Sequence, residues 1–331
     1  MKVFRRLSVF ALALLLLAAS AQAAYSDVPE TSWARASIER ATELGLINGA
    51  NGQFGLGRKI TRAEYATMLC RLMGWELTSP AAGSFADNQD PSQWYYSAIE
   101  TAYAHGALRK ISANVGANEP LSRGEMAVMT VRALGYASLA GEVQDDCAFT
   151  DVATNPGYIA LSHRMGIMDG VGGGRFQPDA PALREQAAVV LLRAYDRLHA
   201  ATPERKTADE APEGAVCAEP IENRGARIPM YPRAPLESVY RAAAKAGKGG
   251  AVALIVTPCD AATGEELRQW ELDAMLSDVA AGVYRSARYK SSYLISGDRV
   301  VWYESETDIA DKLELCRLMG IQTVYLIKKA P

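Results

Sequence analysis

Histidine and cysteine are scarce in this chain of 331 residues, which has 3 histidines and 5 cysteines. There is no Cys-x-x-Cys and no Cys/His cluster, so we expect no structural metal site and no metal or other cofactor. Residues 236–331 contain no histidine at all. A Cys–His or Ser–His dyad is therefore excluded there, and so are the usual ligands of a zinc amidase.

The chain also lacks an excess of charge of one sign, since it has 35 basic and 38 acidic side chains and a net charge of −3. Without a polycationic surface, nucleic acid is not expected as a partner. With 49% hydrophobic and 22% charged residues, the composition is that of a folded protein, long enough for about two domains.

The N-terminal segment is typical of a secretory signal peptide. Lys2, Arg5 and Arg6 precede an apolar run at 9–19, and Ala21-Gln22-Ala23 is a small-x-small cleavage site. We predict a signal peptide over 1–23, an exported chain, and no membrane span after cleavage, since no later run approaches 18 apolar residues. Export permits disulfides, but an odd number of scattered cysteines favours buried thiols with at most one or two bridges.

A threefold internal repeat covers residues 25–198. Its clearest members are three arginines, each 61 residues after the last: Arg62, Arg123 and Arg184. Gly45, Gly106 and Gly166 recur with nearly the same period. Other matched positions are three aspartates, three isoleucines and two tryptophans: Asp27, Asp87 and Asp151; Ile38, Ile99 and Ile159; Trp33 and Trp94. A period this regular indicates tandem structural units.

Each repeat is predicted to fold as helix, loop, helix. In the first, a helix over 32–44 ends at Gly45, and a second helix runs over 61–73 with one apolar stripe. The second helix of the third repeat is expected over 187–198. A single repeat is too small to bury a core, so three should pack together.

The ordered set aromatic-x-Asp, Trp, Ile and Gly, the Gly-rich loop, and Thr61-Arg62-Ala63-Glu64 resembles the S-layer homology domain of bacterial surface proteins. The resemblance implies three tandem repeats, over 24–78, 79–140 and 141–198, in a mostly α, pseudo-threefold helical bundle. It also implies grooves between repeats that bind a secondary cell-wall polysaccharide, often one bearing pyruvate ketals. The chain would then belong to the cell wall or S-layer at the cell surface.

Thr61-x-x-Glu64 and Ser122-x-x-Glu125 are also capping boxes, which explain the hydroxyl and the glutamate without a ligand. Capping does not explain the arginine, because a cation in the first helical turn opposes the helix dipole. Arg62, Arg123 and Arg184 are therefore expected either to bind a ligand carboxylate by two parallel hydrogen bonds or to pair internally with one of the three repeated aspartates.

The remaining candidate ligand-binding residues also have structural alternatives. The tryptophans could stack on sugar rings or fill the core, and the aspartates could face a groove or cap turns. Together the candidate site comprises the three arginines, Glu64, Glu125, Asp27, Asp87, Asp151, Trp33 and Trp94.

The repeats differ in ways that bear on binding. The second has Val115 at the offset of Phe54, and the third reads Leu183-Arg184-Glu185-Gln186, which lacks the capping hydroxyl. Either three weakened sites act together on one polymer, or only one or two of them bind.

Residues 199–235 are rich in proline and are predicted to be a linker. Beyond them, 236–331 should form a small α+β domain whose order β-α-β-β-α-β suggests a ferredoxin-like sandwich. That fold serves many unrelated functions and therefore does not indicate one. We expect an interaction or assembly domain, whose partner the sequence does not identify.

Two alternatives to anchoring on a polysaccharide remain. One is a glycan-acting surface enzyme whose carboxylates, among Glu265, Glu266, Glu304 and Glu306, lie in the C-terminal domain. The other is that the repeats bind protein rather than sugar. We predict no catalytic residues.

Overall fold

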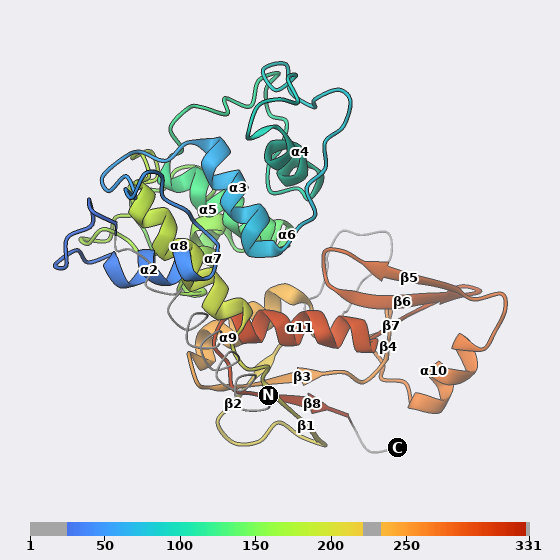
Figure 1. Cartoon of the computed structure of the whole chain (residues 1–331). Coiled ribbons are helices and arrows are strands. Elements are labelled where there is room, and N and C mark those ends of the chain that lie inside the picture. Colours follow the sequence, from blue (N-terminus) through green and yellow to red (C-terminus); the bar gives the residue numbers. More distant parts are fainter. Residues whose placement is uncertain (1–24, 221–232, 329–331) are drawn as a thin grey trace, which may run out of the picture. The chain divides into compact units, whose positions relative to one another are not determined.

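The computed structural model describes residues 25–220 and 233–328, and the signal-peptide prediction lies outside them. Within these ranges the helix pairs of the repeats come first, and strands appear only after residue 203 (Figure 1). The described chain is therefore mixed rather than mostly α. It divides into two compact units; the first contains α2 and α3, and the second contains α5, α7 and the C-terminal sheets.

Each repeat contains the predicted pair of helices. The first helices are α2 (Arg35–Glu43), α4 (Tyr96–Ala104) and α7 (Pro156–Arg164), and the second are α3 (Arg62–Met73), α5 (Arg123–Ala133) and α8 (Arg184–Leu198). A short helix, α6 (Ala137–Glu142), and a 3₁₀ turn, η2 (Gln144–Asp146), follow α5. Ile38, Ile99 and Ile159 are fully buried, as an apolar position that recurs in every repeat should be.

The helix boundaries follow the local chemistry that the sequence indicates. Gly45 ends the first helix with φ of +70°, a backbone conformation that glycine adopts without steric cost. The capping boxes at Thr61 and Ser122 are both present. In the third repeat only half of the box remains: the Leu183 N–H donates to Gln186 Oε1 at 3.1 Å.

Backbone hydrogen bonds join the segments that enter the second helices into a ring. Ile60 donates to the carbonyl of Ala182, Ala182 donates to that of Leu121, and Leu121 donates to that of Ile60, at 3.0, 2.8 and 2.9 Å. These residues stand 61 positions apart and are fully buried. The repeat in sequence is therefore also a repeat in hydrogen bonding.

The C-terminal domain contains two four-stranded sheets. A parallel sheet has the order β1-β8-β3-β2, from β1 (Glu204–Ala208), β8 (Thr323–Ile327), β3 (Ala251–Ile255) and β2 (Ala215–Ala218). An antiparallel sheet has the order β4-β7-β6-β5, from β4 (Cys259–Asp260), β7 (Arg299–Tyr303), β6 (Ser291–Ser296) and β5 (Gly282–Ser286). Helix α9 (Leu236–Ala246) packs on β2, β3 and α11 (Glu306–Leu318), and α11 runs alongside the parallel sheet in Figure 1. The remaining helix, α10 (Gln269–Leu276), precedes β5.

Two sequence predictions for this region are wrong. The ferredoxin-like arrangement needs one antiparallel sheet, but β3 and β8 pair in parallel while the hairpin β6–β7 lies in another sheet. The expected linker contributes β1 and β2 to the parallel sheet, and its residues 221–232 lie outside the described residues. Both strands are short, and β1 is exposed and highly charged, so neither has the apolar pattern that identifies a strand.

None of the five cysteines, all within the described residues, forms a disulfide. Burial raises the pKa of Cys70 to about 11 and that of Cys316 to about 12. These buried thiols behave as small apolar side chains rather than as nucleophiles.

Candidate functional site: three arginine junctions

The three repeated arginines occupy the first position of the second helices, and each reaches the loop of the next repeat. Arg62 donates to the carbonyls of Val115 and Gly116 at 2.9 and 2.8 Å; we call this the first junction. At the second junction Arg123 donates to Phe176 and Asp169 at 3.0 and 2.8 Å. At the third junction Arg184 donates to Phe54 and Asn48 at 2.9 and 2.6 Å. The contacts run from repeat 1 to 2, from 2 to 3, and from 3 back to 1.

The three aspartates hold the loops that receive these arginines. Asp27 accepts backbone N–H groups of Phe54, Gly55 and Leu56 at 2.7, 2.6 and 3.0 Å. Asp87 accepts those of Val115 and Gly116, both at 2.7 Å, and Asp151 those of Phe176 and Gln177, both at 2.8 Å. At each junction one loop residue donates its N–H to the aspartate and accepts the arginine with its C=O. The aspartates are thus loop-positioning residues.

The protonation of these aspartates agrees with that role. Burial alone would raise the pKa of Asp27, but the backbone N–H groups of Phe54, Leu56 and Gly55 outweigh it and hold the pKa below its usual value. The N–H of Phe176 likewise lowers the pKa of Asp151. Both carboxylates therefore stay charged and bound to the backbone at neutral pH.

The internal ion pairs of the arginines involve glutamates, not the aspartates that the sequence suggested. At the third junction Arg184 Nη1 lies 3.1 Å from Glu64 Oε1. At the first junction Arg62 Nη1 lies 3.5 Å from Glu119 Oε2. Among the described residues, none of the three aspartates forms an ion pair with Arg62, Arg123 or Arg184.

The arginines are largely buried, and two of them lie over an aromatic ring. The guanidinium of Arg123 is 4.8 Å from the Phe176 ring centre, and that of Arg184 is 5.3 Å from the Phe54 ring centre. Arg123 and Arg184 are each 7% exposed, and the side chain of Arg62 is 14% exposed. A low-dielectric setting strengthens any charge-assisted hydrogen bond made there.

Glu64 and Glu125 are primarily capping residues. Glu64 Oε2 accepts the Thr61 N–H at 3.0 Å, and Glu125 Oε2 accepts the Ser122 N–H at 2.8 Å. Glu64 is additionally bound to Arg58, with contacts of 2.6 and 3.1 Å. Burial acts to raise the pKa of Glu64, but the hydrogen bonds from Arg58 and Thr61 and the charge of Arg184 lower it overall.

The two repeated tryptophans are on the surface, so the core alternative for them is wrong. Trp33 is 67% exposed and Trp94 is 63% exposed, each just before the first helix of its repeat. Trp94 packs edge-on against Tyr95, with ring centres 5.4 Å apart. An exposed indole presents a flat apolar face to which a sugar ring can bind.

Sequence reasoning missed the carbonyl acceptors and the residues four positions before each arginine. Those positions hold Arg58, Glu119 and Ala180. The backbone N–H groups of Arg184, Arg62 and Arg123 donate to their carbonyls at 2.9, 3.1 and 2.9 Å. Their fixed position four residues before each arginine could have identified them as repeated contact residues. Their side chains differ in charge, however, and therefore form no common motif.

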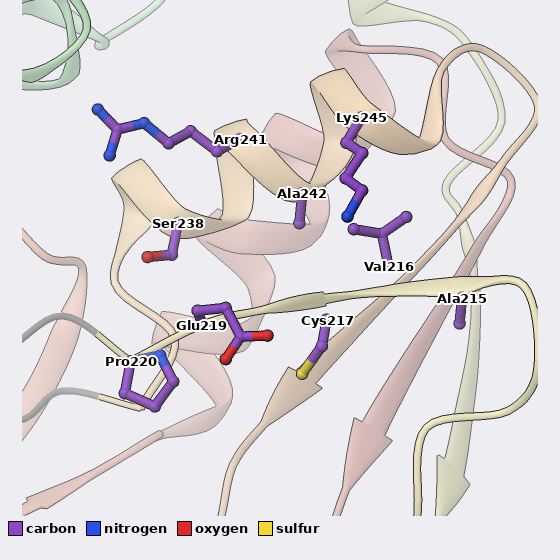
Figure 2. A pocket seen from close by; sticks show the side chains of 9 residues that line it. All are labelled: Ala215, Val216, Cys217, Glu219, Pro220, Ser238, Arg241, Ala242 and Lys245. Atoms are coloured by element: carbon purple, nitrogen blue, oxygen red, sulfur yellow. The ribbon is translucent and has the colours of Figure 1, made fainter.

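A pocket of about 510 Å³ lies in the C-terminal domain between β2 and α9 (Figure 2). Its lining includes Cys217 and Glu219 at the carboxyl end of β2, and Lys245, whose ammonium points toward the strand. Burial raises the pKa of Cys217, with Glu219 adding to the effect, so this thiol is not an activated nucleophile.

Three of the four carboxylates proposed for the surface-enzyme alternative lie beside basic side chains, and Glu266 is 3.4 Å from Arg233. Glu304 is buried beside Lys312, whereas Glu306 is exposed and binds Arg205 at 2.6 and 2.9 Å. Burial raises the pKa of Cys259 to about 11. The described residues contain no group of three or more His, Cys, Asp or Glu side chains that could hold a metal ion.

The repeats, each with an arginine at the start of its second helix, have the architecture of a non-catalytic anchoring module. The family model of the S-layer homology domain matches residues 24–66, 89–127 and 148–188, so the chain carries three S-layer homology domains. It is a cell-surface, cell-wall-associated protein. Over the described residues, no helix has both the length and the apolar character needed to span a bilayer.

Curated relatives include S-layer proteins and enzymes. The chain is 33% identical over 116 residues to an S-layer protein of Bacillus thuringiensis subsp. finitimus, covering 35% of this chain and 14% of the relative. It is 30% identical over 179 residues to the surface-layer 125 kDa protein of Lysinibacillus sphaericus, covering 51% and 15%. It is also 30% identical over 174 residues to an endoglucanase of Bacillus sp. (strain KSM-635), covering 50% and 18%.

The chain thus spans less than a fifth of the length of these relatives. The enzymes match only over the repeats, so their similarity concerns the anchoring module and not a catalytic domain.

Proposed function

We propose that the chain attaches non-covalently to a secondary cell-wall polysaccharide through acid groups, such as pyruvate ketals, that bind at the arginine junctions. The observation that carries this proposal is the environment of the guanidinium groups. Backbone carbonyls orient each of them, and a carbonyl, unlike the glutamates beside Arg62 and Arg184, does not cancel a positive charge. An oriented, partly desolvated guanidinium at a helix N-terminus is suited to bind a carboxylate.

The arrangement of the repeats supports binding to a polymer. We propose that the domains over 24–78, 79–140 and 141–198 form a pseudo-threefold bundle, which the ring of hydrogen bonds among Ile60, Leu121 and Ala182 favours. Three junctions on one bundle would engage several units of one chain, so that modest affinities combine. Trp33 and Trp94 add exposed aromatic faces for sugar rings.

A sedimentation assay on purified sacculi tests the proposal. The full chain should pellet with sacculi that carry a pyruvylated polymer and remain in solution after acid extraction of that polymer. Replacing all three junction arginines by lysine keeps the charge but removes the forked donor geometry, and should reduce binding at least about tenfold. Arg40→Ala is the matched control, since Arg40 is an exposed arginine on α2 that pairs only with Glu43 among the described residues.

The outcome separates polysaccharide binding from protein binding. Retention on extracted sacculi, or a triple variant that binds as well as the native chain, would contradict the proposal. A melting temperature that falls sharply in the lysine variants would show instead that the arginines serve stability alone. The C-terminal domain is proposed as the outward-facing interaction domain, because Glu304 is held by Lys312 and burial raises the pKa of the Cys217 thiol, so that neither group is poised for catalysis.

A further inference from the structure

Among the described residues, the parallel sheet of the C-terminal domain has two edge strands, β1 and β2. An edge strand presents unpaired backbone N–H and C=O groups, and charged side chains on it discourage pairing with another chain. β1 has charged residues at 204–206, whereas the four residues of β2 are alanine, valine, cysteine and alanine. Of the two edges, β2 is therefore the one that its side chains leave open to a further strand.

The register of the sheet determines which way the backbone of β3 faces. Along a strand, alternate residues direct their N–H and C=O groups to opposite sides. The N–H of Val256, which directly follows β3, donates to the carbonyl of Ile327 in β8 at 3.1 Å. The even-numbered residues of β3 therefore face β8, and the odd-numbered residues Ala251 and Ala253 face β2.

The same register shows that the backbone of Cys217 faces away from the sheet. Cys217 lies opposite Ala253, and in a parallel pair the residue opposite a bonding residue directs its own groups to the other side. Two residues earlier, the Ala215 N–H donates to Pro212 at 3.1 Å instead of to β3, as this alternation requires. Among the described residues, the N–H and C=O of Cys217 have no hydrogen-bond partner.

The pocket between β2 and α9 runs along this outer edge. Ala215, Val216 and Cys217 all line it, although successive side chains of a strand point to opposite faces. In Figure 2 the Val216 side chain lies on the α9 side of the ribbon and the Cys217 side chain on the other. One cavity can touch both faces of an edge strand only by passing its outer edge. The pocket of about 510 Å³ therefore gives access to the free backbone groups of Cys217.

The charges that line the pocket favour an acidic ligand. The Lys245 ammonium points toward β2 in Figure 2, and within the described ranges it has no ion-pair partner. Arg241, one turn earlier on α9, is 2.8 Å from Glu237 and is therefore already paired. Glu219, the acidic residue that lines the pocket, follows the carboxyl end of β2, away from Lys245 (Figure 2). A carboxylate brought in beside Lys245 would form a charge-assisted hydrogen bond that the ammonium otherwise lacks.

We propose that the outer edge of β2 binds an extended, acidic peptide segment of a partner protein as a fifth strand of the sheet, with Lys245 binding a glutamate or aspartate of that segment. The segment lies about 4.8 Å from β2 and exchanges hydrogen bonds with the N–H and C=O of Cys217. This inference rests on the proposed role of the C-terminal domain as an interaction domain. It adds the site and the chemical class of the partner.

A proline substitution tests the backbone contact. Cys217→Pro removes the outward N–H without removing a hydrogen bond to β3, and an edge strand accepts proline where the missing N–H faces solvent. The probe is an array of short peptides that alternate threonine or valine with varied residues, each made with a central glutamate and with glutamine in its place. The labelled full chain is applied to the array, and the peptides that bind are titrated in solution by fluorescence anisotropy. Cys217→Pro should weaken binding at least about tenfold, whereas Cys217→Ala, which keeps the N–H, should change it less than about twofold.

A charge substitution tests the role of Lys245. Lys245→Gln should weaken binding of the glutamate peptides at least about fivefold and leave that of the glutamine peptides unchanged. Lys206→Gln is the matched control, because Lys206 lies on the opposite edge strand, β1, and pairs with Glu204 at 2.9 Å. Bound peptide should also slow hydrogen exchange at 215–218 and not at 204–208, which a ligand held by charge alone would not do.

The results separate this inference from anchoring. Normal binding by Cys217→Pro, equal binding of the glutamate and glutamine peptides, or an array on which the native chain binds nothing would each overturn the proposal. Displacement of the peptide by an acidic oligosaccharide that protects the same amides would assign the groove to a glycan instead. Cys217→Pro and Lys245→Gln should sediment with sacculi as the native chain does. A native chain that binds the peptides but not the sacculi would leave the β2 site standing while the polysaccharide proposal fails.

Discussion

A buried ion pair in the C-terminal domain allows a quantitative prediction. Lys312, on α11, is fully buried and donates to Glu304, which is itself 4% exposed, and to Ser291 Oγ at 3.0 Å. Ser291 Oγ donates to the other oxygen of Glu304 at 2.7 Å. Burial lowers the pKa of Lys312 and raises that of Glu304, because both charged forms are desolvated.

Removing one partner of this ion pair should lower the free energy of unfolding strongly, whereas removing both should lower it little. Among the described residues, Lys312→Met leaves the buried Glu304 carboxylate with only Ser291 as a donor, which we expect to lower the free energy of unfolding by about 3–5 kcal/mol. Without its partner the carboxyl is accommodated best when protonated, so the deficit should grow as pH rises from 5 to 8. The double variant Lys312→Met/Glu304→Leu should return to within about 2 kcal/mol of the native chain.

Urea unfolding followed by circular dichroism measures these differences, and hydrogen exchange over 291–303 and 306–318 locates them. Lys206→Met is the control, because Lys206 pairs with Glu204 on the surface at 2.9 Å and should change stability by less than about 0.5 kcal/mol. A single variant that loses under 1 kcal/mol, or a double variant no more stable than Lys312→Met, would refute the reasoning.

Three further predictions concern the repeats. Thr61→Ala removes a capping hydroxyl and should lower stability by about 1 kcal/mol, measurable as a drop in melting temperature; an unchanged value would mean that Glu64 alone caps the helix. Trp33→Ala and Trp94→Ala should leave stability within about 0.5 kcal/mol because both rings are mostly exposed, yet they should weaken sedimentation with sacculi, and normal sedimentation would exclude sugar stacking. The pKa values of Asp27 and Glu64 lie below their usual range, so the stability they contribute is complete above about pH 4.5 and is lost as pH falls through the lowered pKa values; a melting temperature that stays constant from pH 6 to 3 would contradict this.

Much of the repeat architecture was predictable from sequence, because its signals are local. Glycine at a left-handed helix end, a hydroxyl three residues before a glutamate, and an apolar stripe each act within one or two turns of chain. α3 begins and ends within a residue of its prediction. For α8 the structure begins three residues earlier than predicted, at Arg184, since repeat 3 lacks the capping hydroxyl that marked the other starts.

The C-terminal topology was not predictable in the same way. All six elements of the predicted order β-α-β-β-α-β are present, as β3, α10, β6, β7, α11 and β8. The pairing of the strands, however, depends on contacts between segments that are far apart in sequence. β1 and β8, for example, pair although they are more than 100 residues apart. The four-residue β2 and the exposed β1 carry no periodic pattern from which to infer that pairing.

The sequence by itself determined that three related units recur, that each is a capped pair of helices, and that an arginine stands at the start of every second helix. Local propensity and a fixed period are sufficient for those conclusions. Only the tertiary structure decided what surrounds each arginine, because its partners come from another repeat. It brought Glu64 to Arg184 and Glu119 to Arg62, and it left Arg123 with backbone carbonyls and a ring. The charge of a site depends on side chains that folding brings together, and for that reason three similar motifs form three unequal junctions.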